Sequence, residues 1–145
     1  MLDYLYKAFA VWFTGFFPLF EIYVAVPLGL AIGLDPVSVI FFAVAGNTTP
    51  IILIEYGYTW LTKFERINSW LNKLTSEKVS RNVNKYGFWY ILVITPWVGV
   101  WAMGVASKIF QMKSRVFIWG SFISIVTYAV AIVVLIQLGV NLFNE

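Results

Sequence analysis

Long apolar runs separated by short charged stretches dominate the pattern of this chain. Four runs contain at most one charge each: Ala8–Leu34, Pro36–Ile54, Tyr86–Ser107 and Val116–Asn144. An α-helix needs ~20 mostly apolar residues to cross the hydrocarbon core of a bilayer. The pattern therefore predicts an all-α integral membrane protein that enters the membrane several times.

Two of these runs predict complete transmembrane helices. Pro36–Trp60 follows the turn at Asp35, and a proline suits the first helical position. It ends among tyrosine and tryptophan residues, which are typical of a membrane interface. Val116–Phe143 is the second predicted transmembrane helix.

The first apolar run is interrupted near its middle. Between Phe16 and Pro36 it contains Pro18, Glu21, Pro27 and Gly29. In lipid every backbone N–H and C=O needs an internal partner, so a broken helix is tolerated only where protein or a wet cavity shields it. A carboxylate at membrane depth is costly and by default marks a functional site. This segment is therefore the leading candidate site.

Two topologies fit the broken segment. Met1–Phe17 would be ~25 Å long as a helix, short of a ~30 Å hydrocarbon core. Together with Leu19–Leu34 it suits a re-entrant hairpin with its tip near Pro18–Glu21. The alternative is one kinked, tilted helix over Ala8–Leu34.

The second half of the chain repeats this order of elements. Tyr86–Met112 is an apolar segment interrupted at Pro96, and a shift of 78 residues places Pro18 on Pro96. Inverted repeats with discontinuous helices that meet near the midplane are a known transporter design. We predict one membrane domain with a first repeat over residues 1–60 and a second over 86–145.

Charge placement favours two re-entrant hairpins. With both broken segments re-entrant, eight of the ten Lys and Arg residues lie on one side of the membrane and both chain ends lie on the other. With both segments spanning, the bias weakens to seven against two. Either arrangement satisfies the positive-inside rule, and the hairpins satisfy it better.

The stretch Trp60–Lys85 is the polar part of the chain. Its apolar residues recur at spacings of four and three, which places them on one helical face. They are Trp60, Phe64, Ile67, Leu71 and Leu74. We predict an amphipathic helix on the membrane surface, facing anionic lipid and linking the repeats over residues 61–85. A solvated linker is the alternative.

The motif Gly46-Asn47-Thr48-Thr49-Pro50 lies inside the first predicted transmembrane helix. Its Asn-Thr-Thr sequon is not read as a glycosylation site, because a glycan cannot sit at membrane depth. Pro50 predicts a local break, with Asn47, Thr48 and Thr49 available to satisfy the freed backbone groups. Packing between helices is the alternative role for these polar residues.

Composition narrows the chemistry. The chain is 61% hydrophobic and 12% charged and has no cysteine or histidine, which excludes disulfides and Cys/His metal sites. No catalytic triad or phosphate-binding loop is visible, so we expect neither an enzyme nor a cofactor. The net charge of +3 requires no nucleic-acid partner. The start MLDYLYK lacks a basic n-region, so we expect no cleaved signal peptide.

Two motifs resemble the small multidrug export protein family. Glu21-Ile22-Tyr23 and Ala25-Val26-Pro27-Leu28-Gly29, followed by Gly46-Asn47 and Pro50, are similar to the family's Glu-Leu-Arg, Ala-Ile-Pro-Leu-Gly, Gly-Asn and Pro. The second half is similar at Lys85-Tyr86-Gly87-Phe88, Pro96, Gly99 and Trp101. The resemblance covers most of Phe16–Met112.

The chain departs from the family pattern at three positions. Tyr23 stands where the family usually has arginine, and Ile94 and Trp97 replace a proline and a glycine. The family is similar in turn to the DedA/VTT group, whose membrane-embedded hairpins are associated with lipid and lipid-carrier transport. The resemblance therefore implies transport.

Glu21 is the first candidate for the substrate or proton pathway. A carboxylate removed from water favours its neutral form, so it can exchange a proton near neutral pH. The structural alternatives are a permanent ion pair with Lys108 and a cap on a broken helix end. Lys108 is the second candidate, as a partner of Glu21 or a ligand of a phosphate head group; snorkelling to the interface is its alternative.

Other residues complete the candidate pathway. Pro18, Pro27, Pro96, Gly29 and Gly99 would shape the breaks, and the helix N-termini exposed there would favour an anion. Asn47 and Thr48 would add polar contacts. Glu55, about one turn from Trp60, is expected at the interface.

Three functions fit these residues. The first is a transporter or flippase for an anionic lipid or lipid-linked phosphate, coupled to protons through Glu21. The second is efflux of lipophilic cationic drugs, and the third is a membrane scaffold subunit without transport. We expect a homodimer with membrane lipids as partners, integral to a prokaryotic cell membrane.

Overall fold

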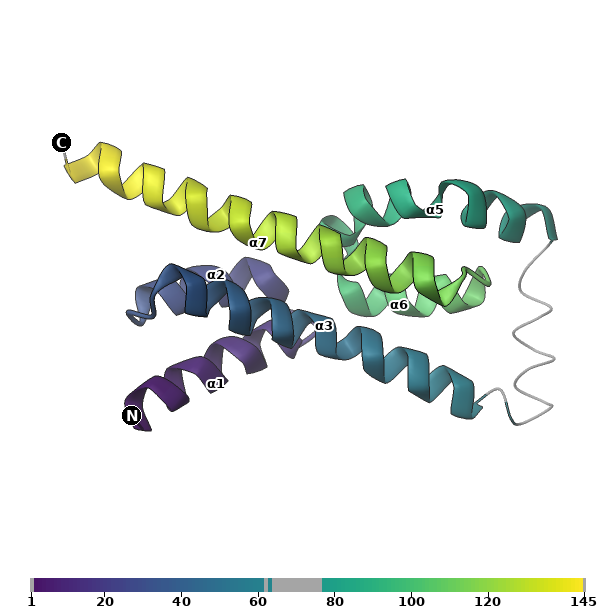
Figure 1. Cartoon of the computed structure of the whole chain (residues 1–145), viewed down its shortest axis with the longest axis horizontal. Helices are drawn as coiled ribbons and strands as arrows, with labels where there is room; N and C mark the ends of the chain where they lie inside the picture. Colours follow the sequence, from purple (N-terminus) through teal and green to yellow (C-terminus); the bar gives the residue numbers. More distant parts are fainter. Residues whose placement is uncertain (1, 62, 64–76, 145) are drawn as a thin grey trace. The chain divides into compact units, whose positions relative to one another are not determined.

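The structure is a computed structural model that describes residues 2–61, 63 and 77–144 (Figure 1). Over these ranges it is helical and contains no strand, which confirms the predicted all-α class. Its helices are α1 (Leu2–Phe16), α2 (Glu21–Ala31), α3 (Pro36–Leu61), α5 (Glu77–Val98), α6 (Val100–Ile109) and α7 (Ser114–Asn144).

The predicted surface helix falls mostly outside the described residues, because 62 and 64–76 are not among them. The last part of that stretch, from Glu77, is helical and continues without a break into the apolar part of α5. The helix that contains the second apolar arm therefore begins nine residues before Tyr86, where the sequence placed the start of that arm.

α3 and α7 are the two helices long and apolar enough to cross a membrane in the part of the chain that is described. The candidate spans are Pro36–Trp60, of 25 residues, and Ser114–Gly139, of 26 residues. At ~1.5 Å per residue either span exceeds a ~30 Å hydrocarbon core. Both predicted transmembrane helices are thus present, and the second begins two residues before Val116.

The helices group into two compact units. The first contains the chain up to Thr49 and from Ile125 onward, and the second is Pro50–Ser124. The first unit therefore holds α1 and α2, and the second holds α5 and α6. α3 and α7 each contribute one segment to either unit.

In the first unit α1 and α3 meet through glycine. A Cβ added to Gly46 would lie 2.1 Å from the carbonyl oxygen of Trp12, and one added to Gly15 would lie 2.8 Å from that of Ala43. No side chain fits between backbones at this distance, and small residues are what allow such an approach between membrane helices. The core around this crossing is apolar and includes Val11, Ile22, Ala25, Val26, Val39 and Ala43.

The break predicted in the first apolar run is present. α1 ends at Phe16, Pro18 lies in the turn that follows, and α2 begins at Glu21. The amides of Phe20 and Glu21 both donate to the Phe17 carbonyl, at 3.1 and 3.2 Å, and α1 and α2 pack against each other. Pro27 lies inside α2 without ending it.

The second break is three residues later than predicted. α5 includes Pro96 and ends at Val98, and the chain turns at Gly99 with φ 89° and ψ 151°. Glycine adopts this conformation readily, whereas a side chain makes it costly. Gly99, rather than Pro96, therefore sets the break.

A serine explains how the helix continues through Pro96. Proline has no N–H for the carbonyl of the residue four positions earlier, which is Leu92. The Ser124 hydroxyl of α7 donates to that Leu92 carbonyl at 2.9 Å. The acceptor freed by the proline is thus satisfied within the second unit, as an apolar environment requires.

The local break predicted at Pro50 is wrong, because α3 is a continuous helix over Pro36–Leu61. The hydroxyls of Thr48 and Thr49 donate to the carbonyls of Val44 and Ala45, at 2.6 and 2.8 Å. These are ordinary bonds from a threonine to its own helix one turn back. One proline removes one helical hydrogen bond, and a long helix packed by its neighbours tolerates that loss.

α2 and α6 end in the same way, 78 residues apart. In each, the backbone amides of the three residues after the helix donate to carbonyls of its last turn and a half, with the same spacing. After α2 the bonds are Ile32 to Leu28, Gly33 to Leu30 and Leu34 to Gly29. After α6 they are Phe110 to Ala106, Gln111 to Lys108 and Met112 to Ser107. The positive φ values also coincide at this spacing, at Glu21 and Gly99 and again at Gly33 and Gln111.

Asp35 caps α3. Its Oδ1 accepts the Ser38 backbone N–H at 2.9 Å, which satisfies one of the amides without a partner at a helix start. The hydrogen bonds that Ser38 donates, from its side chain first and then its backbone, lower the pKa of the Asp35 carboxyl from its ordinary value of 3.8.

We predict that Ser124→Ala destabilises the protein by about 1–3 kcal/mol, because it leaves the part-buried Leu92 carbonyl without this donor. Ser121→Ala is the matched control: Ser121 lies one turn away on α7 and is also buried, and its hydroxyl has no partner among the described residues. Thermal unfolding in detergent checks both. Equal losses for the two variants would contradict the role of Ser124.

We predict that Gly46→Ala costs about 1–3 kcal/mol, because the added methyl group would overlap the backbone of α1. Gly139→Ala should be neutral or stabilising, since nothing lies within 4 Å of a Cβ there and alanine favours helix. The melting temperatures of the two variants measure the difference. A stable Gly46→Ala protein would mean that α1 and α3 do not cross this closely.

We predict that the Asp35 cap weakens in acid. A carboxyl whose pKa is lowered by folding stabilises the folded state above its ordinary pKa, and this contribution disappears as pH falls through the folded value. The melting temperature of the wild type relative to Asp35→Asn, which caps without titrating, should therefore be constant at neutral pH and fall below about pH 4. A difference that is independent of pH would rule out the titrating cap.

Candidate functional site

Glu21 lies at the break between α1 and α2. It is the first residue of α2, and only 7% of its surface is exposed. Its φ is 47°, in the left-handed region that disfavours residues with a side chain. The chain thus holds a carboxylate at a position that a glycine would occupy more easily, and 78 residues later Gly99 stands there.

The surroundings of Glu21 suit a negative charge. The amide groups at the start of a helix carry a partial positive charge, and Glu21 stands in the first turn of α2. Phe20 at the N-cap position provides no side-chain cap. Tyr23, two positions further along α2, interacts electrostatically with Glu21 and also with Tyr128 of α7. Glu21 therefore stands at the positive end of α2, with Tyr23 of the same helix as a polar neighbour.

Five other predicted residues belong to the first unit, and three of them are prolines or glycines in or beside α2. Pro18 is exposed in the turn, and Pro27 is half-buried in α2. A Cβ on Gly29 would lie 2.8 Å from Val39 and 2.9 Å from Val11, so its role is to let α2 pack closely.

Asn47 and Thr48 were predicted to add polar contacts, and their side chains differ in hydrogen bonding. Asn47 is 1% exposed, and its side-chain oxygen has no partner among the described residues. It lies on α3 at the crossing with α1, where its backbone nitrogen is 3.4 Å from a Cβ added to Gly15. The Thr48 hydroxyl donates to the Val44 carbonyl of its own helix. Of the two, Asn47 thus has a side-chain oxygen that can accept a further hydrogen bond.

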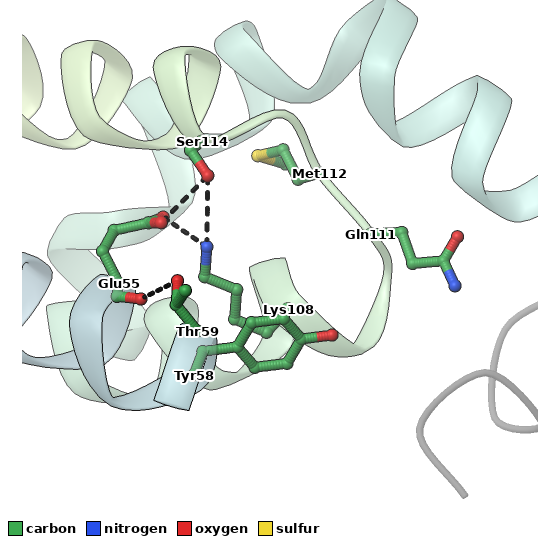
Figure 2. Close-up of a pocket in the computed structure, with 7 residues that line it drawn as sticks. All are labelled: Glu55, Tyr58, Thr59, Lys108, Gln111, Met112 and Ser114. Carbon is green, nitrogen blue, oxygen red and sulfur yellow. Dashed lines mark hydrogen bonds and ion pairs between the residues drawn. The ribbon is translucent and has the colours of Figure 1, made fainter. Parts of the chain in front are cut away.

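Lys108 belongs to a separate polar cluster in the second unit (Figure 2). Its ammonium forms an ion pair with Glu55 of α3. The partner considered from the sequence was Glu21. Ser114, the first residue of α7, joins the pair: its Oγ lies 3.3 Å from the Lys108 Nζ and donates to Glu55 Oε2 at 2.9 Å. The three side chains come from three different helices.

The ion pair borders a cavity of ≈330 Å³ (Figure 2). The side chains of Lys108 and Glu55 are only 9% and 16% exposed. The Lys108 ammonium also lies 5.2 Å from the centre of the Tyr58 ring, within range of a cation–π interaction. The remaining lining residues are Thr59, Gln111, Met112 and Ser114.

This cluster was not predicted from the sequence, although the sequence contains a signal for it. Glu55 is the only charged residue within Pro36–Trp60, and it was expected simply to reach the interface. A charge inside a spanning helix usually has a partner of opposite charge in the protein. Lys108 was available as that partner, but its distance in sequence hid the pairing.

The candidates therefore fall into two groups. Glu21, Pro18, Pro27, Gly29, Asn47 and Thr48 lie in the first unit, and Lys108, Pro96 and Gly99 lie in the second. Among the described residues, no group of three or more Asp or Glu residues could hold a metal ion.

Comparison with known proteins identifies one family. The family model described as "Putative small multi-drug export protein" matches residues 21–136, a range that begins at Glu21 and includes Lys108. No curated protein and no solved structure matches the chain. Because the matched range covers well over half of its length, the chain belongs to this small multidrug export protein family.

Proposed function

We propose that this protein is a small membrane transporter in which Glu21 binds and releases the coupling proton. The observation that carries the proposal is a buried carboxylate at a helix break, held at a φ of 47°. Strained residues persist where the surrounding structure enforces them and cluster at functional sites. A buried carboxylate that gains and loses a proton couples transport to the proton gradient.

The proposed architecture is an inverted repeat of two re-entrant hairpins, α1–α2 and α5–α6, each followed by a spanning helix. α2 and α6 have 11 and 10 residues, ~17 and ~15 Å of helix, about half of the hydrocarbon core. The matching helix ends and φ values 78 residues apart support a common origin of the two halves. In this arrangement both breaks lie at membrane depth.

The proposed substrate is an anionic lipid or a lipid-linked phosphate. The helices that begin at Glu21 and Val100 direct amide groups toward the breaks, and such helix starts favour anions. Protonation of Glu21 would remove the competing negative charge when the anion is present. A homodimer would supply the surface that a chain of this size needs to enclose a pathway.

Efflux of lipophilic cations is the second candidate. The description of the family names multidrug export, and the Glu21 carboxylate is a suitable counter-charge for a cation. The neighbouring side chains include Phe17, Phe20 and Tyr23, and aromatic rings also attract cations. A scaffold role without transport is the third, in which the breaks serve packing alone.

We predict that Glu21→Gln abolishes substrate-dependent proton flux in proteoliposomes, measured with a polyprenyl phosphate and, separately, with a lipophilic cation. Flux with the phosphate that is lost in the variant supports the leading proposal, whereas flux with the cation alone supports drug efflux. Asp3→Asn is the matched control, because it removes a carboxylate that is 79% exposed and far from any break.

Glu21→Gly separates function from folding. Glycine relieves the positive φ, so this variant should fold at least as stably as Glu21→Gln while lacking flux. No flux in the wild type with either substrate, together with a lower melting temperature in both variants, would assign Glu21 to a structural role and favour the scaffold.

A further inference from the structure

The cavity beside Glu55 and Lys108 has the composition of a binding site. At ≈330 Å³ it falls at the lower end of the roughly 300–1,000 Å³ typical of ligand pockets. Its polar groups converge from three helices of one compact unit: a carboxylate from α3, an ammonium from α6 and a hydroxyl from α7 (Figure 2). The sequence named Lys108 as a candidate ligand of a phosphate head group, and the transport proposal through Glu21 gives Glu55, Ser114 and the cavity no role.

The charges of the cavity are balanced. Glu55 and Lys108 neutralise each other, and both are largely removed from water. A ligand with a single charge would bind one of them and leave the other buried without compensation, which costs several kcal/mol. A ligand that carries one negative and one positive group can replace the internal ion pair without leaving either charge unpaired. The cavity therefore selects for a zwitterion.

Each group in the cavity suits one half of such a ligand. The Lys108 ammonium and the Ser114 hydroxyl, 3.3 Å apart, can both donate to the oxygens of one phosphate. Exposed Lys113 and Arg115 flank Ser114 in the chain and add positive charge at this end of α7. The Glu55 carboxylate can accept from a primary ammonium, and the Tyr58 ring, which already borders the Lys108 ammonium, can face a second cation.

The position of the cavity along α3 indicates where the ligand comes from. Glu55, Tyr58 and Thr59 belong to the last two turns of the span Pro36–Trp60. Tyr56 and Trp60 in the same turns are 76% and 59% exposed. Exposed tyrosine and tryptophan at the end of a span mark the depth of the lipid head groups. The cavity thus lies at the level of phosphate and amine groups of lipids.

We propose that this cavity binds the head group of an aminophospholipid, with the phosphate on Lys108 and Ser114 and the ammonium on Glu55. In the unliganded protein the two side chains bind each other and keep the cavity neutral. The site is in the second unit, whereas Glu21 is in the first, so the proposal does not depend on transport by Glu21.

The test uses the wild-type chain and a series of short-chain lipids that differ only in the head group. Phosphatidylethanolamine, its monomethyl and dimethyl derivatives, phosphatidylcholine and phosphatidylglycerol are titrated into the purified protein, and binding is read from the rise in melting temperature. We expect affinity to fall along the series as N–H donors are lost. The ethanolamine lipid should bind about tenfold tighter than the choline lipid, because choline has no N–H for Glu55. It should exceed phosphatidylglycerol by about the same factor, because that lipid has no ammonium.

Glu55→Gln tests the assignment of the carboxylate. It keeps the size of the side chain and one acceptor oxygen and removes the charge, so the variant should lose the preference for ethanolamine over choline. Asp3→Asn is the matched control, because it removes the carboxylate of the exposed Asp3–Lys7 pair and should leave the preference intact. If the ion pair is merely structural, Glu55→Gln should lower the melting temperature, and the wild type should show no preference among the lipids.

Three results would overturn the proposal. Equal stabilisation by all five lipids would show that the cavity does not recognise a head group. Tighter binding of phosphatidylglycerol than of phosphatidylethanolamine would show an anion site and not a zwitterion site. Free phosphoethanolamine binding as tightly as the lipid would assign the site to a soluble zwitterion.

Discussion

This structure depends on one constraint: where no water is present, every backbone carbonyl needs a hydrogen-bond donor from the protein. Proline and helix breaks release such carbonyls, and this chain has both in its apolar segments. At Pro96 the solution is visible, because the Ser124 hydroxyl reaches the Leu92 carbonyl from α7. One side chain on a neighbouring helix thus allows α5 to continue to Gly99, and the position of that glycine decides where the chain turns.

The elements that could be predicted from the sequence are those set by local pattern. The spans in α3 and α7 follow from the length of apolar runs, and the break near Pro18 follows from a proline in the middle of such a run. The errors at Pro50 and Pro96 have one cause. The effect of a proline inside a helix depends on what the neighbouring helices supply, and a linear pattern does not contain the Ser124–Leu92 bond or the packing that keeps α3 continuous.

The same limit applies to the candidate site. The burial of Glu21 could be expected from its apolar context, but its positive φ could not, because glutamate is a poor indicator of that conformation. Lys108 was recognised as unusual, yet its partner Glu55 lies 53 positions away, on a different helix. Long-range pairs of this kind depend on topology. The cavity beside them becomes visible only when α3, α6 and the start of α7 are brought together.

The bond between Ser124 and Leu92 also imposes an order on biosynthesis. A chain is made from its N-terminus, so α5 and its proline are synthesised before α7. Until then the Leu92 carbonyl lacks the donor that the finished protein provides. α5 and α6 can therefore take their final form only after α7 has been made, so the last helix of the chain completes the structure of the part that precedes it.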